Sequence, residues 1–296
     1  MLGTVLTAMV TPFGEDGGIR YEAAAELARH LVAHGSTGLV VSGTTGESPA
    51  LTAAEKLALF RTVTGAVQGQ AAVIAGTGSN CTAAAVELTA AAEAAGVDGI
   101  LLVAPYYNRP TPEGLYRHFR ATAEATALPV MLYNVPGRTG VNLDVETVLR
   151  LAEIDNIIAL KEAGGDLVQA AEICAQAPPG FSLYSGDDAL TLPLLSIGAA
   201  GVVSVASHLA GPQIARMIEE YRQGRPDEAA RLHRFLLPLF KGLFTTVNPI
   251  PVKAALNLLG IDAGPPRLPL LPLEGEALAA LKHLLQQYGR QLLAIN

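Results

Sequence analysis

Short apolar runs alternate along the chain with longer stretches rich in alanine and leucine. Eight of these runs are continuously apolar, which is typical of parallel strands covered on both faces. They predict strands at residues 5–10, 38–42, 72–75, 99–103, 129–133, 157–161, 182–185 and 201–204. The stretches between them predict helices. Several have recognisable starts, with a capping box at Thr52 and Glu55 and N-caps at Thr111 and Asp144.

Eight strand–helix units within about the first 210 residues predict a (β/α)8 TIM barrel, an α/β fold typically of ~250 residues. The competing doubly wound sheet would require a glycine-rich phosphate-binding fingerprint after its first strand, and residues 11–14 do not provide one. After the eighth strand the pattern is helical, at residues 212–222, 227–243, 249–259 and 274–293. We therefore expect a catalytic barrel at residues 1–224 and a small all-helical C-terminal subdomain at residues 225–296.

Composition and charge argue against several classes of partner. The formal net charge is -7 and there is no basic tract, so we expect no nucleic-acid partner. The apolar run at 5–10 lacks a preceding basic residue, and proline and glycine interrupt the uncharged run at 189–209. Neither run predicts a signal peptide or a membrane span. The only cysteines, Cys81 and Cys174, form no disulfide framework, which favours the cytoplasm.

One histidine pair has a spacing that is found in metal sites. His30 and His34 lie four residues apart on the first predicted helix. That helix should lie outside the barrel, and no third ligand is evident in the sequence. We therefore expect no metal site.

Lys161 is the leading candidate for chemistry, because barrel active sites lie at the carboxyl ends of the strands. Of the five lysines in the chain, only Lys161 ends a buried apolar strand. Burial disfavours the charged form of an amine, and a neutral amine is the nucleophile that forms an imine with a ketone. The alternative is a structural lysine paired with a carboxylate such as Glu162. Adjacent strand residues point to opposite faces, so Glu162 is poorly placed for that pairing.

The other predicted strand ends carry hydroxyl groups and one arginine. Residues 43–47 (GTTGE) contain Thr44 and Thr45 between glycines, which suits a small anion such as a carboxylate but also an ordinary tight turn. Tyr133 ends the fifth strand, where a phenol can pass protons or simply occupy the barrel rim. Arg138 follows it and suits either a substrate carboxylate or solvent.

Together these strand-end segments resemble the dihydrodipicolinate synthase family, of the N-acetylneuraminate lyase superfamily. The matching segments run in order through the whole predicted barrel. They are residues 43–48 (GTTGES), 76–78 (GTG), 105–108 (PYYN), 133–140 (YNVPGRTG) and 161–163 (KEA). Each segment alone is a modest signal, and their joint occurrence in order is a specific one.

The resemblance implies a catalytic role for four residues. Lys161 would form the imine with pyruvate and Tyr133 would relay protons. Thr44 would link Tyr133 to Tyr107 in a hydroxyl relay, with Tyr107 supplied by the neighbouring subunit. The resemblance also implies a homotetramer built as a dimer of dimers, and chemistry that requires no cofactor.

The resemblance also implies how the substrates are bound. Thr45, with the backbone N–H groups of residues 44 and 45, would hold the pyruvate carboxylate. Arg138 would bind the carboxylate of aspartate semialdehyde, while Gly186 and the backbone of Val203 would line the pocket. The implied reaction condenses pyruvate with L-aspartate 4-semialdehyde to 4-hydroxy-tetrahydrodipicolinate, on the route to diaminopimelate and lysine.

Lysine-inhibited members of the family bind lysine at a subunit interface. From that site this chain retains Ser48, Asn80 and Tyr106. It carries alanine at position 84, where such members have a glutamate that holds the inhibitor's amine, and Lys56 at a histidine position. A missing carboxylate and an added cation both disfavour a cationic ligand. The sequence therefore predicts weak or no feedback by lysine.

Two alternatives remain open at the level of sequence. The same imine chemistry serves sister enzymes, namely N-acetylneuraminate lyase, 2-keto-3-deoxy sugar acid aldolases and 4-hydroxy-2-oxoglutarate aldolase. Arg138 within residues 136–140 (PGRTG) favours aspartate semialdehyde, because relatives that act on sugar acids usually vary there. The other alternative is a non-catalytic protein on the same scaffold, since a fold does not determine function. The complete set of reactive residues disfavours it.

Overall fold

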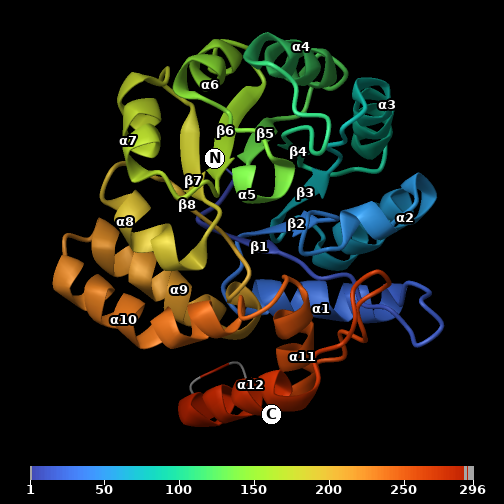
Figure 1. Ribbon diagram of the computed structural model, residues 1–296, viewed down its shortest axis with the longest axis vertical. Helices are drawn as coiled ribbons and strands as arrows, with labels where there is room; N and C mark the ends of the chain where they lie inside the picture. The colour runs from blue at the N-terminus through green and yellow to red at the C-terminus, as the bar shows by residue number, and fades with distance from the viewer. Residues whose placement is uncertain (1, 290–291, 293–296) are drawn as a thin grey trace.

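Eight parallel strands close into a barrel in which each strand pairs with the next and β8 pairs with β1 (Figure 1). The computed structural model describes residues 2–289 and 292. The strands are β1 (Val5–Ala8), β2 (Gly38–Val41), β3 (Ala72–Gly76), β4 (Gly99–Val103), β5 (Val130–Asn134), β6 (Ile157–Glu162), β7 (Ser182–Ser185) and β8 (Gly201–Ser204). All eight predicted strands are present, and the predicted TIM barrel is confirmed.

Helices surround the strands on the outside of the barrel (Figure 1). They are α1 (Tyr21–Ala33), α2 (Ala53–Val67), α3 (Thr82–Glu93), α4 (Pro112–Ala123), α6 (Val145–Ala152), α7 (Leu167–Gln176), α8 (Thr191–Leu195) and α9 (Ser207–Arg222). Three short elements lie in the loops at the carboxyl ends of the strands, which is where an active site is expected. They are the helix α5 (Pro136–Thr139) and two 3-10 turns (Ser48–Ala50 and Asp188–Leu190).

Side-chain caps begin several helices as the sequence predicts. The Thr52 hydroxyl accepts a hydrogen bond from the Glu55 N–H, and the Glu55 carboxylate accepts one from the Thr52 N–H. This reciprocal capping box satisfies two N–H groups that the first turn of α2 leaves without backbone partners. Thr111 and Asp144 cap α4 and α6 in the same position.

The helix after β8 begins earlier than predicted. The sequence places its start at Pro212, because proline favours the first turn of a helix. In the structure α9 begins at Ser207 and is kinked at Ala210, where φ is -138° and ψ is 32°. Pro212 therefore follows a break between two helical pieces, where a residue without an N–H is tolerated.

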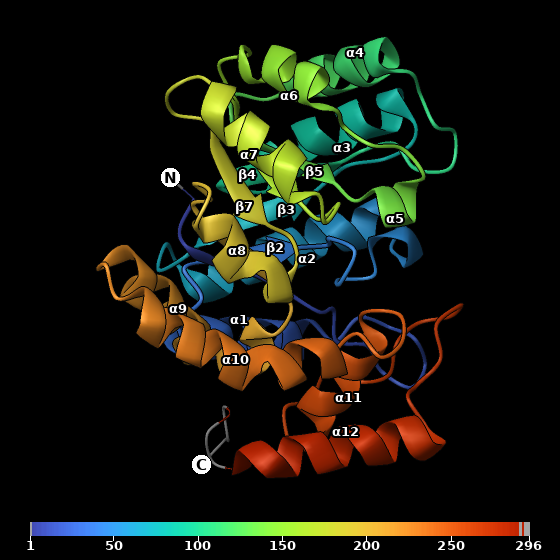
Figure 2. The same cartoon turned by 60° about the vertical axis from the view of Figure 1, so that its left-hand side comes forward.

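Three further helices follow α9. They are α10 (Pro226–Gly242), α11 (Ile250–Leu258) and α12 (Gly275–Tyr288). α10 contacts α8 and α9, while α12 contacts α10 and α11 on the outside of the molecule (Figures 1 and 2). The last predicted helix extends to residue 293, but α12 ends at Tyr288, and positions 290, 291 and 293 lie outside the described residues.

The strands bury side chains on both of their faces. The helices cover the outer face, and a separate apolar cluster fills the barrel interior. The inner cluster includes Leu6, Val40, Ile74, Leu101, Met131, Ala159, Tyr184 and Val203. Because side chains fill its interior, the barrel is not an open channel, and a ligand can reach the strands only at their ends. No helix within residues 2–289 is long and apolar enough to cross a membrane.

Candidate active site

Lys161 lies near the end of β6, between two tyrosines. Parallel pairing places it beside Tyr133 of β5 and Tyr184 of β7. Lys161 Nζ is 4.1 Å from the centre of the Tyr133 ring, and only 6% of the lysine is exposed. A cation over the face of an aromatic ring is attracted by the ring quadrupole. The structure therefore brings a buried amine and a phenol together at the mouth of the barrel.

Glu162 is held away from Lys161 by its own hydrogen bonds. Its carboxylate accepts a hydrogen bond from Asn134 Nδ2 at 3.0 Å and another from the Gly164 N–H. Burial raises the pKa of Glu162 above its usual range, and these donors act against that shift. The Glu162 carboxylate thus accepts hydrogen bonds from Asn134 and from the loop after β6, and the amine of Lys161 faces Tyr133 instead.

Gly186 forms the wall behind the Lys161 side chain. A Cβ placed on Gly186 would lie 3.1 Å from Lys161 Cε and 2.7 Å from the Cβ of Ala163. Only glycine leaves the lysine its observed position without a shift of the neighbouring chain. Val203 of β8 is buried in the inner apolar cluster, which also contains Tyr133 and Tyr184.

The loop after β2 presents two threonines with different environments. Thr45 is 2% exposed, and its Oγ1 accepts a hydrogen bond from Asn248 Nδ2 at 2.8 Å. Its hydroxyl proton remains available for donation to a ligand. Thr44 is partly exposed and lines a cavity that Tyr133 also lines. The loop is therefore anchored at Thr45 and open at Thr44.

A cavity of about 250 Å³ is lined by three of the predicted catalytic and substrate-binding residues, but not by Lys161, Thr45, Gly186 or Val203. Thr44, Tyr133 and Arg138 line it together. The remaining lining residues are Ser42, Gly43, Ser48, Pro49, Lys56, Gly76, Gly78, Leu101, Val103, Tyr106, Val135 and Thr139. Its volume suits small substrates, because ligand pockets of ≈ 300–1,000 Å³ accommodate drug-sized molecules.

Arg138 is exposed to solvent and lines this cavity. It lies on α5, and its Nη2 donates to the backbone oxygen of Asn248 at 3.4 Å. It also lines a neighbouring cavity of about 310 Å³ together with Thr44 and Asn248. A guanidinium in this position can form a bidentate pair with a carboxylate that enters from solvent.

Tyr107 does not lie with the other predicted site residues. It is 88% exposed and adopts a positive φ of 74°, which is uncommon for an aromatic residue. Its N–H donates to the oxygen of Thr139 at 3.3 Å, which fixes the backbone of this loop. The side chain thus points away from the site of its own chain and is available to a second molecule.

Some of the residues retained from the lysine-inhibitor site line the cavity, and others lie outside it. Ser48, Lys56 and Tyr106 line the cavity, and the Ser42 hydroxyl lies 3.3 Å from the Ser48 hydroxyl. The oxygen of Asn80 accepts a hydrogen bond from the Asn108 side chain at 2.8 Å. Burial lowers the pKa of Lys56 from its usual value.

A metal is not suggested by the arrangement of the side chains. Among residues 2–289 and 292, no group of three or more histidine, cysteine, aspartate or glutamate side chains could hold an ion. The His30 and His34 rings lie 4.2 Å apart, on the last turn of α1 and on the residue that follows it.

Sequence reasoning did not find the residues that hold the threonine loop from the C-terminal side. Asn248 bonds to Thr45, and Lys253 of α11 forms a buried ion pair with Glu47 at 2.8 Å. One available signal was the position of Lys253 in an otherwise apolar helix, Ile250–Leu258. A lysine surrounded by apolar residues in this way requires a buried partner.

Comparison with known proteins gives matches that cover nearly the whole chain. A sequence model described as the Dihydrodipicolinate synthetase family matches residues 1–288. The 4-hydroxy-tetrahydrodipicolinate synthase of Moorella thermoacetica is 58% identical over 287 residues, which covers 97% of this chain and 98% of that protein. Another enzyme of that name, from Thermosynechococcus vestitus, is 57% identical and covers 97% of each chain.

Solved structures agree with this assignment. Dihydrodipicolinate synthase from Cyanidioschyzon merolae, solved with lysine bound, has a TM-score of 0.96 and 52% identity, covering 97% of this chain and 98% of that chain. Dihydrodipicolinate synthase DapA-2 from Bacillus anthracis has a TM-score of 0.95 and 50% identity, with the same coverage. At these TM-scores and coverages the fold is shared along nearly the whole chain. The protein belongs to the dihydrodipicolinate synthetase family.

Proposed function

We propose that this protein is a Schiff-base-forming lyase that condenses pyruvate with L-aspartate 4-semialdehyde to 4-hydroxy-tetrahydrodipicolinate, in diaminopimelate and lysine biosynthesis. The observation that carries the proposal is the buried amine of Lys161, 4.1 Å from the Tyr133 ring centre at the mouth of a closed barrel. Membership of the family and the names of the most similar enzymes support the choice of substrates.

The first half of the reaction forms the nucleophile. The amine of Lys161, once it has lost its proton, attacks the C2 carbonyl of pyruvate, and water leaves as the imine forms. The protonated imine withdraws electrons, so a proton of the pyruvate methyl group becomes acidic and its removal gives an enamine. Tyr133, whose ring lies beside the Lys161 amine, would carry protons in these steps, and Thr44, which lines the same cavity as Tyr133, would be the next hydroxyl along the relay.

The second half forms the ring. The enamine carbon attacks the aldehyde carbon of aspartate semialdehyde and makes the new C–C bond. The substrate's own amine then attacks the imine carbon and displaces Lys161, which closes the ring and frees the enzyme. Pyruvate and the semialdehyde lose one water molecule in total, and no cofactor is needed for any step.

The substrate carboxylates have separate partners in this proposal. Thr45 and the N–H groups of residues 44 and 45 hold the carboxylate of pyruvate beside Lys161. Arg138, which lines the cavity, holds the carboxylate of the semialdehyde. Gly186 and the backbone of Val203 complete the pocket. Separate carboxylate sites fix the two carbons that react, which lowers the entropic cost of the bond-forming step.

We further propose a cytoplasmic homotetramer, a dimer of dimers, in which Tyr107 completes the site of the neighbouring subunit. Its 88% exposure and fixed backbone support this role, because a tyrosine side chain seldom projects fully into water without a partner. Leu167 and Val168 on α7 are also exposed apolar residues. They suit the second contact between dimers.

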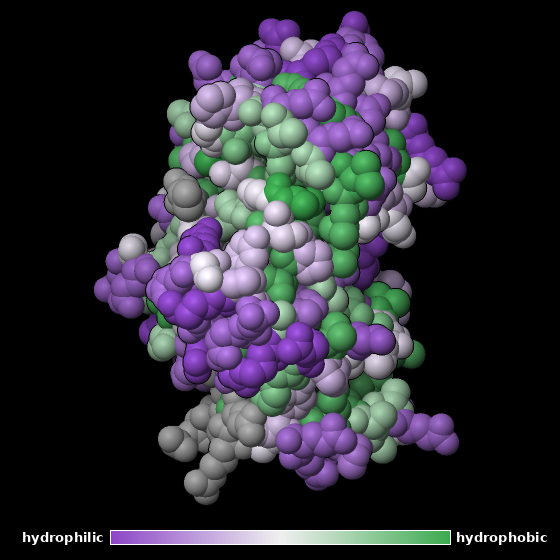
Figure 3. All heavy atoms as spheres, turned by 90° about the vertical axis from the view of Figure 1, so that its left-hand side faces the viewer, coloured by the Kyte–Doolittle hydropathy of each residue, from purple (hydrophilic) through white to green (hydrophobic). Residues whose placement is uncertain are grey.

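The domain organisation follows the same proposal. Residues 1–224 would form the catalytic barrel and residues 225–296 an appended helical subdomain. The surface of α10 on this subdomain is hydrophilic (Figure 3), with ion pairs such as Arg231–Glu228, so it suits solvent more than a subunit contact.

Borohydride trapping tests the imine directly. Incubation with pyruvate and borohydride should attach one pyruvyl unit at Lys161, as located by peptide mass spectrometry. The K161M variant should give no adduct, whereas K241M, at an exposed lysine on α10, should give the full adduct. Absence of the adduct from the unmodified enzyme would contradict the proposal.

The second substrate is tested by turnover. Pyruvate with aspartate semialdehyde should be consumed far faster than N-acetylneuraminate, 2-keto-3-deoxy sugar acids or 4-hydroxy-2-oxoglutarate are cleaved. Faster cleavage of one of these would assign the same imine chemistry to a sister reaction instead.

A further inference from the structure

The loop that carries Thr44 and Thr45 ends in a buried carboxylate. Glu47 is 4% exposed and has a left-handed backbone with φ of 57°. Its N–H donates to the oxygen of Thr44 at 3.0 Å, which closes the turn. The Thr11 hydroxyl donates to the oxygen of Gly46 at 2.7 Å. The conformation of the loop is therefore set by contacts beyond its two threonines.

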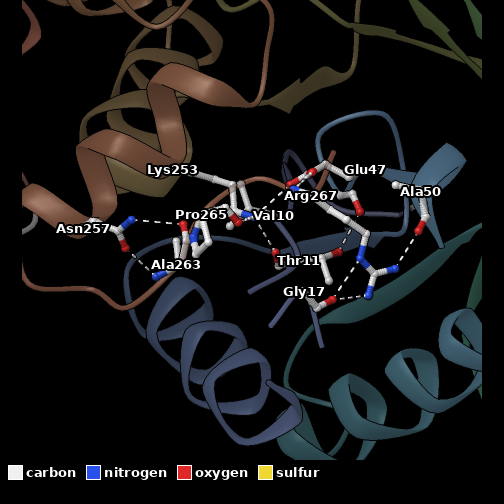
Figure 4. Close-up of polar contacts among 12 residues, drawn as sticks. Val10, Thr11, Gly17, Glu47, Ala50, Lys253, Asn257, Ala263, Pro265 and Arg267 are labelled. Atoms are coloured by element: carbon white, nitrogen blue, oxygen red, sulfur yellow. Dashed lines mark hydrogen bonds and ion pairs between the residues drawn. The ribbon is translucent and has the colours of Figure 1, made fainter. Parts of the chain in front are cut away.

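The carboxylate of Glu47 is held from the C-terminal part of the chain. Lys253 Nζ of α11 donates to Glu47 Oε1 at 2.8 Å, and the Arg267 N–H donates to Glu47 Oε2 at 2.8 Å (Figure 4). Both oxygens thus have partners that lie more than 200 residues away in the sequence. The pair joins the helical C-terminal segment to the loop after β2.

The environment of Lys253 leaves little freedom in this contact. Lys253 is 1% exposed, and its ammonium also donates to the oxygens of Thr11 at 2.9 Å and Pro265 at 2.8 Å (Figure 4). Its three N–H groups therefore have three acceptors. The Phe13 ring centre lies 4.4 Å from Nζ. An ammonium that is fully bonded and enclosed fixes the position of the carboxylate that it binds.

We propose that Glu47 and Lys253 are positioning residues, which hold the loop of Thr44 and Thr45 in the geometry that binds the carboxylate of the first substrate. Asn248, which also belongs to the C-terminal part, bonds to the Thr45 side chain at 2.8 Å and acts in the same direction. This inference rests on the proposed function, because it takes the loop as the pyruvate carboxylate site.

An ion pair suits this task better than an apolar contact does. Apolar contacts have no preferred direction, whereas two hydrogen-bonded oxygens fix both the distance and the orientation of the carboxylate. A buried ion pair adds little net stability compared with a well-packed apolar pair, so stability alone does not explain its presence. Loop geometry does explain it, because displacing the Glu47 backbone displaces the adjacent residues 44 to 46.

The test measures pyruvate binding by borohydride trapping at a series of pyruvate concentrations. The E47Q variant keeps the size of the side chain and removes its charge. The E47Q/K253M variant removes both charges, so no buried charge is left without a partner. We expect half-saturation by pyruvate to rise about tenfold or more in both, with a smaller change in kcat at saturation and in KM for the semialdehyde.

The matched control is D262N. Asp262 accepts a hydrogen bond from Arg20 at 2.8 Å, so it also links the C-terminal part to the N-terminal half of the chain, but at the surface and away from the loop. D262N should keep the unmodified half-saturation. Thermal unfolding of every variant separates loss of stability from loss of binding. If E47Q does not fold, half-saturation by pyruvate in the double variant tests the same inference.

Two results would overturn the inference. Unchanged half-saturation in folded E47Q/K253M would show that the pair only avoids an unpaired buried charge. An equal rise in D262N would show a general loosening of the C-terminal part. Neither result affects the imine proposal, which fails only if the unmodified enzyme forms no pyruvate adduct, and that result would remove both proposals.

Discussion

At the scale of single residues, the site depends on positions where the absence of a side chain leaves room for Lys161. Gly186 is the clearest case, because a Cβ there would lie 3.1 Å from Lys161 Cε and within 3.0 Å of the Glu162 oxygen. A lysine displaced by a few tenths of an ångström loses its approach to the substrate carbonyl, and the rate of imine formation depends strongly on that approach.

The G186A variant should therefore fold but lose about ten- to a hundredfold in kcat/KM. The matched control is G65A, in the last turn of α2, where a Cβ would meet no atom within 4 Å. G65A should keep full activity and gain roughly 0.5–1 kcal/mol of unfolding free energy, because alanine favours a helix over glycine. Steady-state kinetics and urea unfolding of both variants give the comparison. Equal activity of G186A and the unmodified enzyme would contradict this.

Feedback by lysine is a second prediction at this scale. The cavity of Ser48 and Tyr106 is present, but Lys56 lines it and position 84 is alanine. Burial lowers the pKa of Lys56, yet even a neutral lysine cannot replace the missing carboxylate that would hold the inhibitor's amine. Lysine up to millimolar concentration should leave the rate almost unchanged. Half-maximal inhibition at submillimolar lysine would refute this prediction.

The reactive residues could be predicted from the sequence because each belongs to a local pattern. A continuous apolar run shows where a strand ends, and the barrel rule then places Lys161, Tyr133 and Thr44 at one rim. The β5–β6 register, in which Tyr133 lies opposite Lys161, follows once neighbouring strands are paired. The orientation of Tyr107 could not be derived in this way, because a loop outside the pattern determines it.

At the scale of elements, the start of α2 is fastened to the segment after α11. Arg267 Nη2 donates to Glu55 Oε1 at 2.8 Å. Glu55 is also the third residue of α2 and the acidic member of its capping box. The Arg267 guanidinium, aided by the Thr52 groups, lowers the pKa of Glu55 from 4.5 to about 2. The charged form of Glu55 thus stabilises the fold.

The pH dependence of this contribution has a definite sign. The pKa of Glu55 is lower in the folded state, so its contribution is present above about pH 4.5 and is lost as the pH falls toward 2. E55Q should lower the unfolding free energy at pH 7, with the difference shrinking as the pH falls through this range. Glutamine retains the capping box, so the loss reports the charge. Equal destabilisation of E55Q at pH 7 and pH 2.5 would contradict this assignment.

Element boundaries were predictable where a local signal marks them. The capping box and the apolar runs are such signals, and both agree with the structure. The start of α9 was not, because its first turn precedes Pro212 across a kink at Ala210 that only tertiary packing determines. Partners separated by 206 residues, such as Glu47 and Lys253, lie beyond any local pattern.

At the scale of the whole molecule, the exposed Tyr107 makes a prediction about pairs of subunits. If its phenol serves the neighbouring site, a subunit carrying Y107F and a subunit carrying K161M can together form one complete site. Random pairing of equal amounts gives half mixed dimers, each with one intact site of two, so about a quarter of the unmodified activity should return. Co-expression followed by rate measurement tests this.

Its control is each variant alone, which should have little or no activity. No recovery in the co-expressed mixture, with mixed dimers demonstrated by mass spectrometry, would place Tyr107 in its own subunit's site, whereas full activity of Y107F alone would place it outside catalysis. Sedimentation velocity on the unmodified protein should show the proposed tetramer.

The bond between Glu47 and Lys253 also concerns the order in which the molecule is made. A ribosome adds roughly 5–20 residues per second, so the 206 residues between these partners take about 10 to 40 s to synthesise. Until then the carboxylate of Glu47 has no cation to meet and must remain hydrated or protonated. A nascent chain can therefore pair its eight strands before its substrate loop is fixed, because the partners of Glu47 are made only when synthesis reaches Lys253 and Arg267.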